Sequence, residues 1–333
     1  MAEHAHLSKI DDEFATAFAK VPPPPPGPPT VEGTRTIYTN VLVPAAKGLV
    51  SLPAESEYQV KDHHIDVGNG VKVVARSIVP TAKEGEDGTF PLLFWCHGGG
   101  WTMGDLNWDD YRLRRAAVDT RIAVVNCEYR LAPENPFPAA VNDCFAALKH
   151  VATNPESFSG SLSKGFHVGG QSAGGNLAAV MAILARDDPV FKDRPLTGQL
   201  LLIPVTIHPD AYPEKYKSSL LSMEQNKDAP ILTAELMRKY WAWYAAPPTD
   251  PRASPLLLPS HKGLPPAFLM VCGLDPLRDE GLLYGKVLSA AGVKTKVEVY
   301  SGVPHGFELV DCTIGKARKY EADLGAAIRW LLA

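Results

Sequence analysis

The sequence has few cysteines and no strong charge of either sign. Only five of its 333 residues are cysteine, and their spacing matches no metal-binding motif. The 33 basic and 37 acidic residues leave a net charge of -4, so the basic surface that nucleic-acid binding requires is absent. We therefore expect no metal site, no nucleophilic cysteine and no nucleic-acid partner.

Long hydrophobic runs are also missing. No apolar run approaches the roughly 20 residues needed to span a bilayer, and the opening MAEHAHLSKIDDEF lacks the apolar stretch of a signal peptide. No N-x-S/T glycosylation site occurs. The hydrophobic content of 45% is typical of a globular protein with a sizeable core. We expect a soluble, cytoplasmic protein without a membrane span.

The first 55 residues differ in character from the rest of the chain. Residues 4–20 carry Leu7, Ile10, Phe14 and Phe18 on one stripe, which predicts a short amphipathic helix. VPPPPPGPPT at 21–30 imposes polyproline II geometry and ends any helix. We interpret this stretch as a stiff spacer within an N-terminal segment, 1–55.

An alternation of strands and helices follows. Residues 58–80 predict an antiparallel hairpin that turns at Gly68-Asn69-Gly70. Short apolar runs then predict strands at 90–97, 121–129, 165–170, 196–205, 266–273 and 293–301. Helical patterns lie between most of them, at 138–151, 174–186, 278–291 and 316–332. This order predicts an α/β fold with a mostly parallel sheet covered by helices on both faces.

A long gap, 206–265, separates two of these strands. It is too long for a loop without secondary structure, and LTAELMRKYWAWYAAPP within it predicts a helix capped by Thr233. Trp241, Trp243 and Tyr244 lie on this helix, either beside an acyl pocket or in ordinary core. We interpret 206–262 as an insertion that forms a cap, and 56–205 with 263–333 as one catalytic domain.

One serine stands among small residues in GGQSAGG. Gly170-Gln171-Ser172-Ala173-Gly174 fits G-x-S-x-G between a predicted strand and a predicted helix. Such a turn forces the serine into strained backbone angles and lifts its hydroxyl above the sheet. Glycines also permit close packing of a helix on a sheet, so the pattern alone leaves both interpretations open.

A glycine run, His97-Gly98-Gly99-Gly100-Trp101, follows an earlier strand. Three glycines leave backbone N–H groups unblocked, as the stabilisation of an anionic oxygen requires. Gly98 and Gly99, with Ala173, are our candidates for this oxyanion hole. His97 could be a base, but we favour a role in tying down the loop.

Two further strand ends carry an acid and a base. Asp275 follows the strand at 266–273, and His305 follows the next strand. A serine nucleophile needs an imidazole base, which in turn needs a carboxylate to fix its tautomer. Asp279 and Glu280 are rival acids, although both lie within the following helix. We predict a triad of Ser172, His305 and Asp275.

Five motifs together resemble the hormone-sensitive-lipase-like branch of the α/β-hydrolases, a group of carboxylesterases and lipases. They are HGGGW, EYRLAPENPFPAAVNDC, GQSAGGNLAA, DPLRDEG and PHGF, in that order. The resemblance implies the triad and oxyanion loop named above and a cap over the site, formed by roughly 1–55 and 206–262. It also implies a buried structural pair of Arg130 and Asp143. Gln171 departs from the family pattern, which usually has an acid there.

The resulting hypothesis is a serine carboxylesterase that forms an acyl-enzyme on short- to medium-chain esters and needs no cofactor. Candidate substrate-binding residues are Trp101, Gln171, Trp241 and Tyr244. An arylformamidase or amidase would use the same residues, and a non-catalytic ligand receptor is a further alternative. The sequence leaves a homodimer open.

Overall fold

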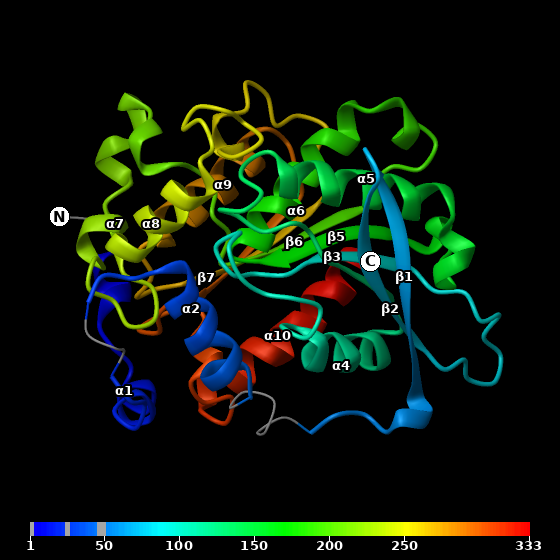
Figure 1. The fold of residues 1–333 in the computed structure, drawn as a ribbon, viewed down its shortest axis with the longest axis horizontal. Coiled ribbons are helices and arrows are strands. Elements are labelled where there is room, and N and C mark those ends of the chain that lie inside the picture. The colour runs from blue at the N-terminus through cyan, green and yellow to red at the C-terminus, as the bar shows by residue number, and fades with distance from the viewer. Residues whose placement is uncertain (1–2, 24–26, 45–50) are drawn as a thin grey trace.

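Eight strands form a single sheet in the computed structural model, which describes residues 3–23, 27–44 and 51–333. The sheet lies at the centre of the molecule (Figure 1). Their order across the sheet is β1-β2-β4-β3-β5-β6-β7-β8. The strands are β1 (Tyr58–Gly68), β2 (Val71–Pro80), β3 (Leu92–Cys96), β4 (Ala123–Cys127), β5 (Phe166–Gln171), β6 (Gly198–Leu202), β7 (Ala267–Cys272) and β8 (Thr295–Tyr300).

The pairing of the strands confirms the predicted sheet. β1 and β2 form the antiparallel hairpin, β2 runs antiparallel to β4, and the remaining neighbours are parallel. Strands β3 to β7 are buried along their whole length, as their continuous apolar sequences predict. The carboxyl ends of β3, β5, β7 and β8 therefore lie along one edge of the sheet, where the predicted site residues follow.

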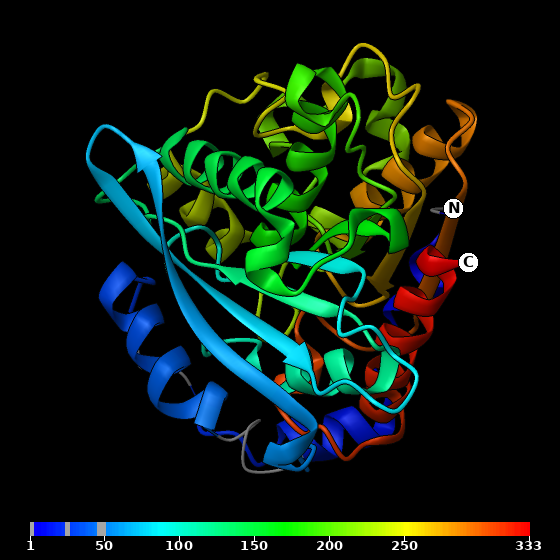
Figure 2. The ribbon, with the colours of Figure 1, turned by 90° about the vertical axis from the view of Figure 1, so that its right-hand side faces the viewer.

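Helices cover both faces of the sheet (Figures 1 and 2). Helices α5 (Ala139–Thr153), α6 (Ala173–Asp187) and α9 (Arg278–Ala290) pack on one face, and α1 (Asp12–Phe18), α4 (Asp110–Thr120) and α10 (Gly315–Leu332) pack on the other. Among the described residues, α2 (Val31–Ile37), α7 (Ser222–Gln225) and α8 (Ala234–Tyr244) are further α-helices. Thr233 caps α8 by accepting a hydrogen bond from the Leu236 N–H, as predicted.

The helix predicted at 4–20 is wrong in extent. The structure has a short 3-10 turn at Ala5–Ser8 and then the separate helix α1. Between them the chain binds a distant loop, because Gly302 donates to the Leu7 carbonyl and accepts from the Asp11 N–H. Asp11 also caps α1 through the Phe14 N–H. The polyproline prediction for 21–30 falls partly on 24–26, which lie outside the described residues.

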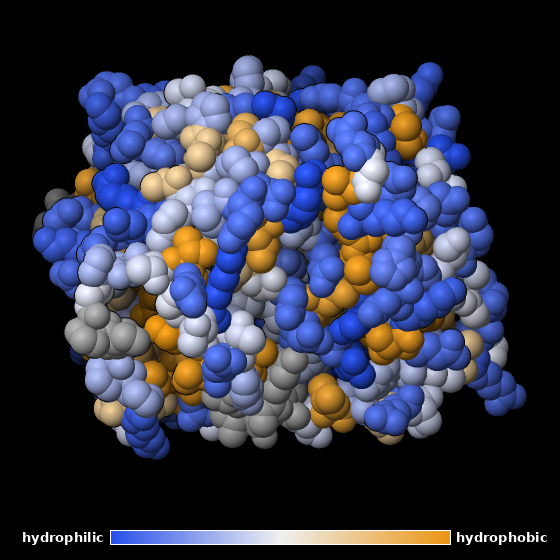
Figure 3. Space-filling view, in the orientation of Figure 1, coloured by the Kyte–Doolittle hydropathy of each residue, from blue (hydrophilic) through white to orange (hydrophobic). Residues whose placement is uncertain are grey.

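The pair Arg130 and Asp143 is present, with the two guanidinium nitrogens 2.7 and 2.9 Å from the carboxylate oxygens. Asp143 is buried, whereas the Arg130 side chain is partly exposed, so the prediction of a buried pair holds for the acid alone. In the part of the chain that the structure describes, no helix is both long and apolar enough to cross a membrane. The face in Figure 3 shows hydrophobic side chains in several groups interrupted by polar ones.

Candidate active site

Ser172 lies in the sharp turn between strand β5 and helix α6. Its φ of +57° and ψ of -118° are values that residues other than glycine rarely adopt. A β carbon on Gly170 would overlap the backbone of Gly174, and one on Gly174 would overlap the carbonyl oxygen of Cys96. The turn therefore needs glycine on both sides, and it holds Ser172 at the N-terminus of a helix.

The structure brings Ser172, His305 and Asp275 together. The His305 Nε2 is 2.8 Å from the Ser172 Oγ, and its Nδ1 is 2.7 Å from the Asp275 Oδ2. Because a carboxylate only accepts hydrogen bonds, Nδ1 carries the hydrogen and Nε2 is left to accept the serine proton. The other oxygen of Asp275 accepts from the Leu277 N–H at 2.8 Å. This geometry is that of a general base oriented by an acid.

The rival acids of the sequence analysis point elsewhere. Asp279 accepts from the N–H groups of Leu221 and Ser222, each at 2.8 Å. Glu280 accepts from the Thr206 N–H at 2.6 Å. Asp275 is thus the carboxylate that meets the imidazole of His305.

The glycine loop after β3 offers backbone donors beside the serine. Among the described residues, neither the Gly98 N–H nor the Gly99 N–H has a hydrogen-bond acceptor. Ala173 is the first residue of helix α6, where N–H groups have no partner within the helix. A β carbon on Gly98 would lie 3.1 Å from the Gln171 carbonyl oxygen, so this loop packs tightly on the serine turn.

The His97 side chain is buried beneath the glycine loop and hydrogen-bonds to its backbone. Its Nδ1 donates to the Gly98 carbonyl at 2.8 Å, and its ring stacks on Tyr129. The Tyr129 hydroxyl donates in turn to the His97 carbonyl at 2.9 Å. Burial lowers the pKa of His97 to about 4, so its ring is neutral at physiological pH. These contacts give His97 the loop-tying role favoured from the sequence.

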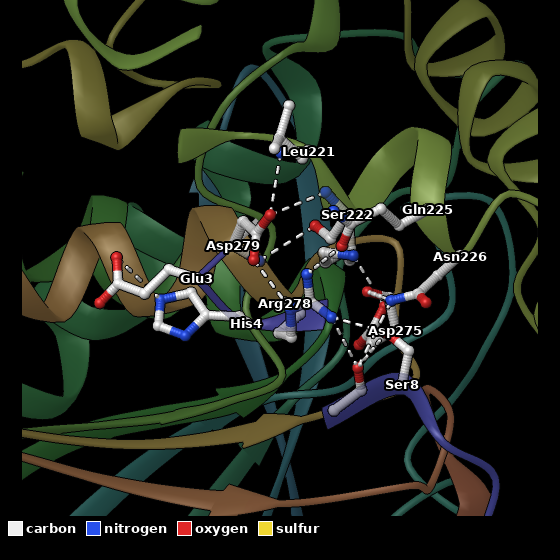
Figure 4. Close-up of polar contacts among 12 residues, drawn as sticks. Glu3, His4, Ser8, Leu221, Ser222, Gln225, Asn226, Asp275, Arg278 and Asp279 are labelled. Carbon is white, nitrogen blue, oxygen red and sulfur yellow. Dashed lines mark hydrogen bonds and ion pairs between the residues drawn. The ribbon is translucent and has the colours of Figure 1, made fainter. Parts of the chain in front are cut away.

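The loop that carries Asp275 is fixed by buried polar side chains from segment 206–262 (Figure 4). Asn226 donates through Nδ2 to the Asp275 carbonyl at 2.9 Å, and the Ser222 hydroxyl donates to the Pro276 carbonyl at 2.7 Å. No sequence pattern relates these residues to the acid, since some 50 residues separate them. Side chains of segment 206–262 thus hold the backbone of the loop that carries Asp275.

Arg278 extends this network to the N-terminal segment (Figure 4). Its guanidinium donates to the Ser8 hydroxyl at 2.7 Å and to the Gln225 side-chain oxygen at 2.6 Å, and it pairs with Asp279 at 2.8 Å. Arg278 is completely buried, where a charge needs such partners. Three distant segments of the chain therefore meet at the loop after β7.

The aromatic residues predicted to bind substrate pack on one another. The rings of Trp101 and Tyr244 stack with their centroids 4.3 Å apart, and Trp241 lies 4.7 Å from Trp101. All three are buried. The structure thus places Trp101, which follows the glycine loop, against two residues of helix α8. The contact of these residues with a substrate stays a prediction.

Gln171 points into a buried polar cluster. Its side-chain oxygen accepts from Arg112, and its nitrogen donates to Glu308 at 2.6 Å. Both polar atoms of the amide are therefore engaged by protein groups. No sequence motif marks Arg112 or Glu308, so neither was predicted to lie near the site.

Comparisons with known proteins agree with this geometry. Residues 93–309 match a family model described as the alpha/beta hydrolase fold. The versiconal hemiacetal acetate esterase of Dothistroma septosporum is 38% identical over 75% of this chain and 76% of its own. Esterase LipI of Mycobacterium tuberculosis is 37% identical over 77% of both chains.

A solved structure titled as vibralactone cyclase is also similar. It shares 42% identity and a TM-score of 0.95, covering 98% of this chain and 96% of that one. The esterase relatives support a hydrolase that acts on carboxylic esters. The chain belongs to the α/β-hydrolases, in the hormone-sensitive-lipase-like branch that its motifs predicted.

Proposed function

We propose that the chain is a serine carboxylesterase that hydrolyses short- to medium-chain acyl esters through an acyl-enzyme. The observation that carries this proposal is the hydrogen-bonded relay from Ser172 through His305 to Asp275. It stands beside backbone N–H groups without acceptors among the described residues. Nucleophile, base, acid and oxyanion donors are the complete set that acyl transfer needs.

In the proposed reaction, His305 takes the proton of Ser172 while the serine oxygen attacks the ester carbonyl. The N–H groups of Gly98, Gly99 and Ala173 stabilise the oxyanion. The imidazolium then protonates the leaving alcohol. In the second half, His305 activates water, which attacks the acyl carbon and releases the acid and the free serine.

We propose further that residues 1–55 and 206–262 form a cap over this site. Tyr38, which follows helix α2, stacks on Trp108 near the glycine loop, and Arg35 donates to the Thr102 carbonyl at 2.7 Å. From segment 206–262, Tyr240 packs against Gly100. Both segments thus border the loop that carries the oxyanion donors.

The aromatic group of Trp101, Trp241 and Tyr244 is our candidate for one wall of the acyl pocket. Its rings are already packed together, which limits the volume that they leave for an acyl chain. Such a wall favours short and medium chains over long ones. The cytoplasmic location and the homodimer stay predictions.

The test is a panel of p-nitrophenyl esters from acetate to palmitate, with Ser172→Ala as the paired variant. We expect the highest kcat/KM between two and eight acyl carbons, and a loss of about 10⁶-fold in kcat for Ser172→Ala. A folded wild-type protein that hydrolyses none of these esters would contradict the proposal. A maximum at the longest chains would contradict the chain-length prediction alone.

A second candidate rests on the 42% identity with the vibralactone cyclase. An acyl group on Ser172 can be attacked by a hydroxyl of the same substrate in place of water, which forms a lactone and returns the proton to the serine. A hydroxyacyl thioester or p-nitrophenyl ester separates the two outcomes. Lactone as the main product supports a cyclase, and hydroxy acid supports the esterase.

A further inference from the structure

A buried arginine on helix α4, Arg112, contacts three acidic side chains and the Gln171 amide next to the serine turn. The Arg112 side chain is 1% exposed, and its guanidinium lies 3.0 Å from Glu321, 3.1 Å from Glu308 and 3.6 Å from Asp109. It also donates to the Tyr111 hydroxyl at 2.9 Å. We call Arg112, these three acids and Gln171 the Arg112 cluster.

Gln171 completes this cluster with a neutral amide. Its nitrogen donates to the Glu308 Oε1 at 2.6 Å, and its oxygen accepts from the Arg112 Nη1. Arginine only donates, and an ionised carboxylate only accepts. The amide therefore has one orientation here, and an ionised carboxylate in its place could not donate to Glu308.

The bond between Gln171 and Glu308 joins the two loops that hold nucleophile and base. Gln171 directly precedes Ser172, and Glu308 follows His305 by three residues, in the 3-10 helix Phe307–Leu309. The same two loops meet a second time at the Ser172–His305 hydrogen bond. The Ser172–His305 bond lies among the proposed reacting groups, whereas the Gln171–Glu308 bond is buried behind them.

The charge balance of the cluster favours an uncharged residue at position 171. One guanidinium faces three carboxyl groups, and burial raises the pKa of Asp109 to about 6 and raises that of Glu321. A fourth carboxyl group would add negative charge where the acids already outnumber the base, which is costly in a buried site. It would also replace the donor to Glu308 by an acceptor.

We propose that Gln171 and Glu308 are a positioning pair, which holds the serine loop and the histidine loop in register for proton transfer. This inference rests on the proposed function. Neither residue touches the reacting atoms in this arrangement, so losing their bond lowers kcat and leaves KM nearly unchanged. A misplacement of about 1 Å between reacting groups can cost about 100-fold in rate.

The test exchanges the two side chains. Gln171→Glu alone sets two carboxyl groups against each other, and we expect kcat to fall about 100-fold with KM within twofold. The double variant Q171E/E308Q restores one donor and one acceptor with the net charge unchanged. We expect its kcat to return to within about fivefold of wild type. Rates are counted per active site, by titration with an organophosphate.

Gln199→Glu is the matched control. Gln199 is also fully buried in the sheet, and its amide donates to the Pro265 carbonyl at 3.0 Å. It lies on strand β6 beside Val168 of β5, away from the end of β5 that carries Gln171. This variant measures the general effect of a buried carboxyl group on folding, and we expect near-normal kcat per site.

If Q171E does not fold, Gln171→Met serves in its place, because it removes both hydrogen bonds without adding charge. We expect its kcat to fall about tenfold.

Recovery in the double variant supports the positioning pair. A double variant as slow as Q171E overturns it. A single variant, either Q171E or Gln171→Met, that keeps the wild-type kcat also overturns it.

Crystal structures of wild type and Q171E give a readout that needs no ester. We expect the distance from the Ser172 Oγ to the His305 Nε2 to exceed 3.5 Å in the variant. A wild-type protein inactive on all esters would refute the proposed function. The positioning pair would then be tested by the Ser172 Oγ to His305 Nε2 distance alone, and an unchanged distance in Q171E would overturn it.

Discussion

The ring of Tyr240, on helix α8, lies directly against Gly100 in the glycine loop. A β carbon on Gly100 would come within 2.5 Å of this ring, and the φ of Gly100 is +57°. Either observation alone disfavours a side chain at this position. The helix from segment 206–262 is thus fitted to the loop that carries the proposed oxyanion donors.

Replacing Gly100 by alanine should therefore disturb catalysis. The methyl group must displace either Tyr240 or the loop. A displaced loop would move the N–H groups of Gly98 and Gly99, our proposed oxyanion donors, away from the substrate. We expect kcat for p-nitrophenyl butyrate to fall by about 10- to 100-fold, somewhat less than the loss of a whole oxyanion donor.

Gly292→Ala is the control for backbone strain. Gly292 has a φ of +83°, but nothing lies within 4 Å of the position that a β carbon would take. This variant should lose about 1 kcal/mol of stability and keep its kcat. Equal kcat values for Gly100→Ala and wild type would refute the fitted contact.

The choice of catalytic acid is tested by two asparagine variants. Asp275→Asn leaves the shape of the site intact but removes the carboxylate that fixes the His305 tautomer. We expect a loss in kcat of about 10⁴-fold. Asp279→Asn weakens the hydrogen bonds to Leu221 and Ser222, so it should lower Tm and reduce kcat less than tenfold. The reverse order of kcat losses would show that the acid is misassigned.

Local patterns predicted most of the fold, and they singled out the three side chains that the structure brings together at the candidate site. Strands β3 to β7 are buried on both faces, so their apolar runs are continuous, and the glycines around Ser172 are required by backbone overlap. Helix α4 was not predicted, because its buried side includes the charged side chain of Arg112. Hydrophobic periodicity detects a helix by its apolar buried side, so it misses a helix whose buried side carries charged residues.

The polar partners of the site could not be predicted either. The contacts of Asn226 with the Asp275 carbonyl and of Gln171 with Glu308 join residues 49 and 137 positions apart. Sequence patterns report which element a residue occupies, whereas these contacts depend on how separate elements pack. The same limit explains the helix predicted at 4–20, which is interrupted by bonds to Gly302.

Glu280 provides a prediction on pH and stability. Burial raises its pKa to about 8, against the ordinary value of 4.5, although two backbone N–H groups oppose the shift. Its Oε2 has no hydrogen-bond partner among the described residues. Between these two pKa values the folded state binds more protons than the unfolded state. The contribution of Glu280 to the free energy of unfolding therefore falls as pH rises, by at most about 1.4 kcal/mol per unit.

Glu280→Gln removes this titration and keeps an oxygen for the N–H groups of Thr206 and Ile207. Urea unfolding of both proteins at pH 5.5, 6.5, 7.5 and 8.5 gives the comparison. We expect the variant to gain stability relative to wild type as pH increases. A difference that stays constant across this range would mean that Glu280 does not titrate there.

The site of covalent labelling tests the central claim most directly. Paraoxon should transfer one diethylphosphoryl group to the protein and release one equivalent of p-nitrophenolate. Mass spectrometry of the digest should locate this group on Ser172, and His305→Ala should slow the labelling by at least 1000-fold. A label on another residue, or no label on a folded protein that still hydrolyses esters, would contradict the account.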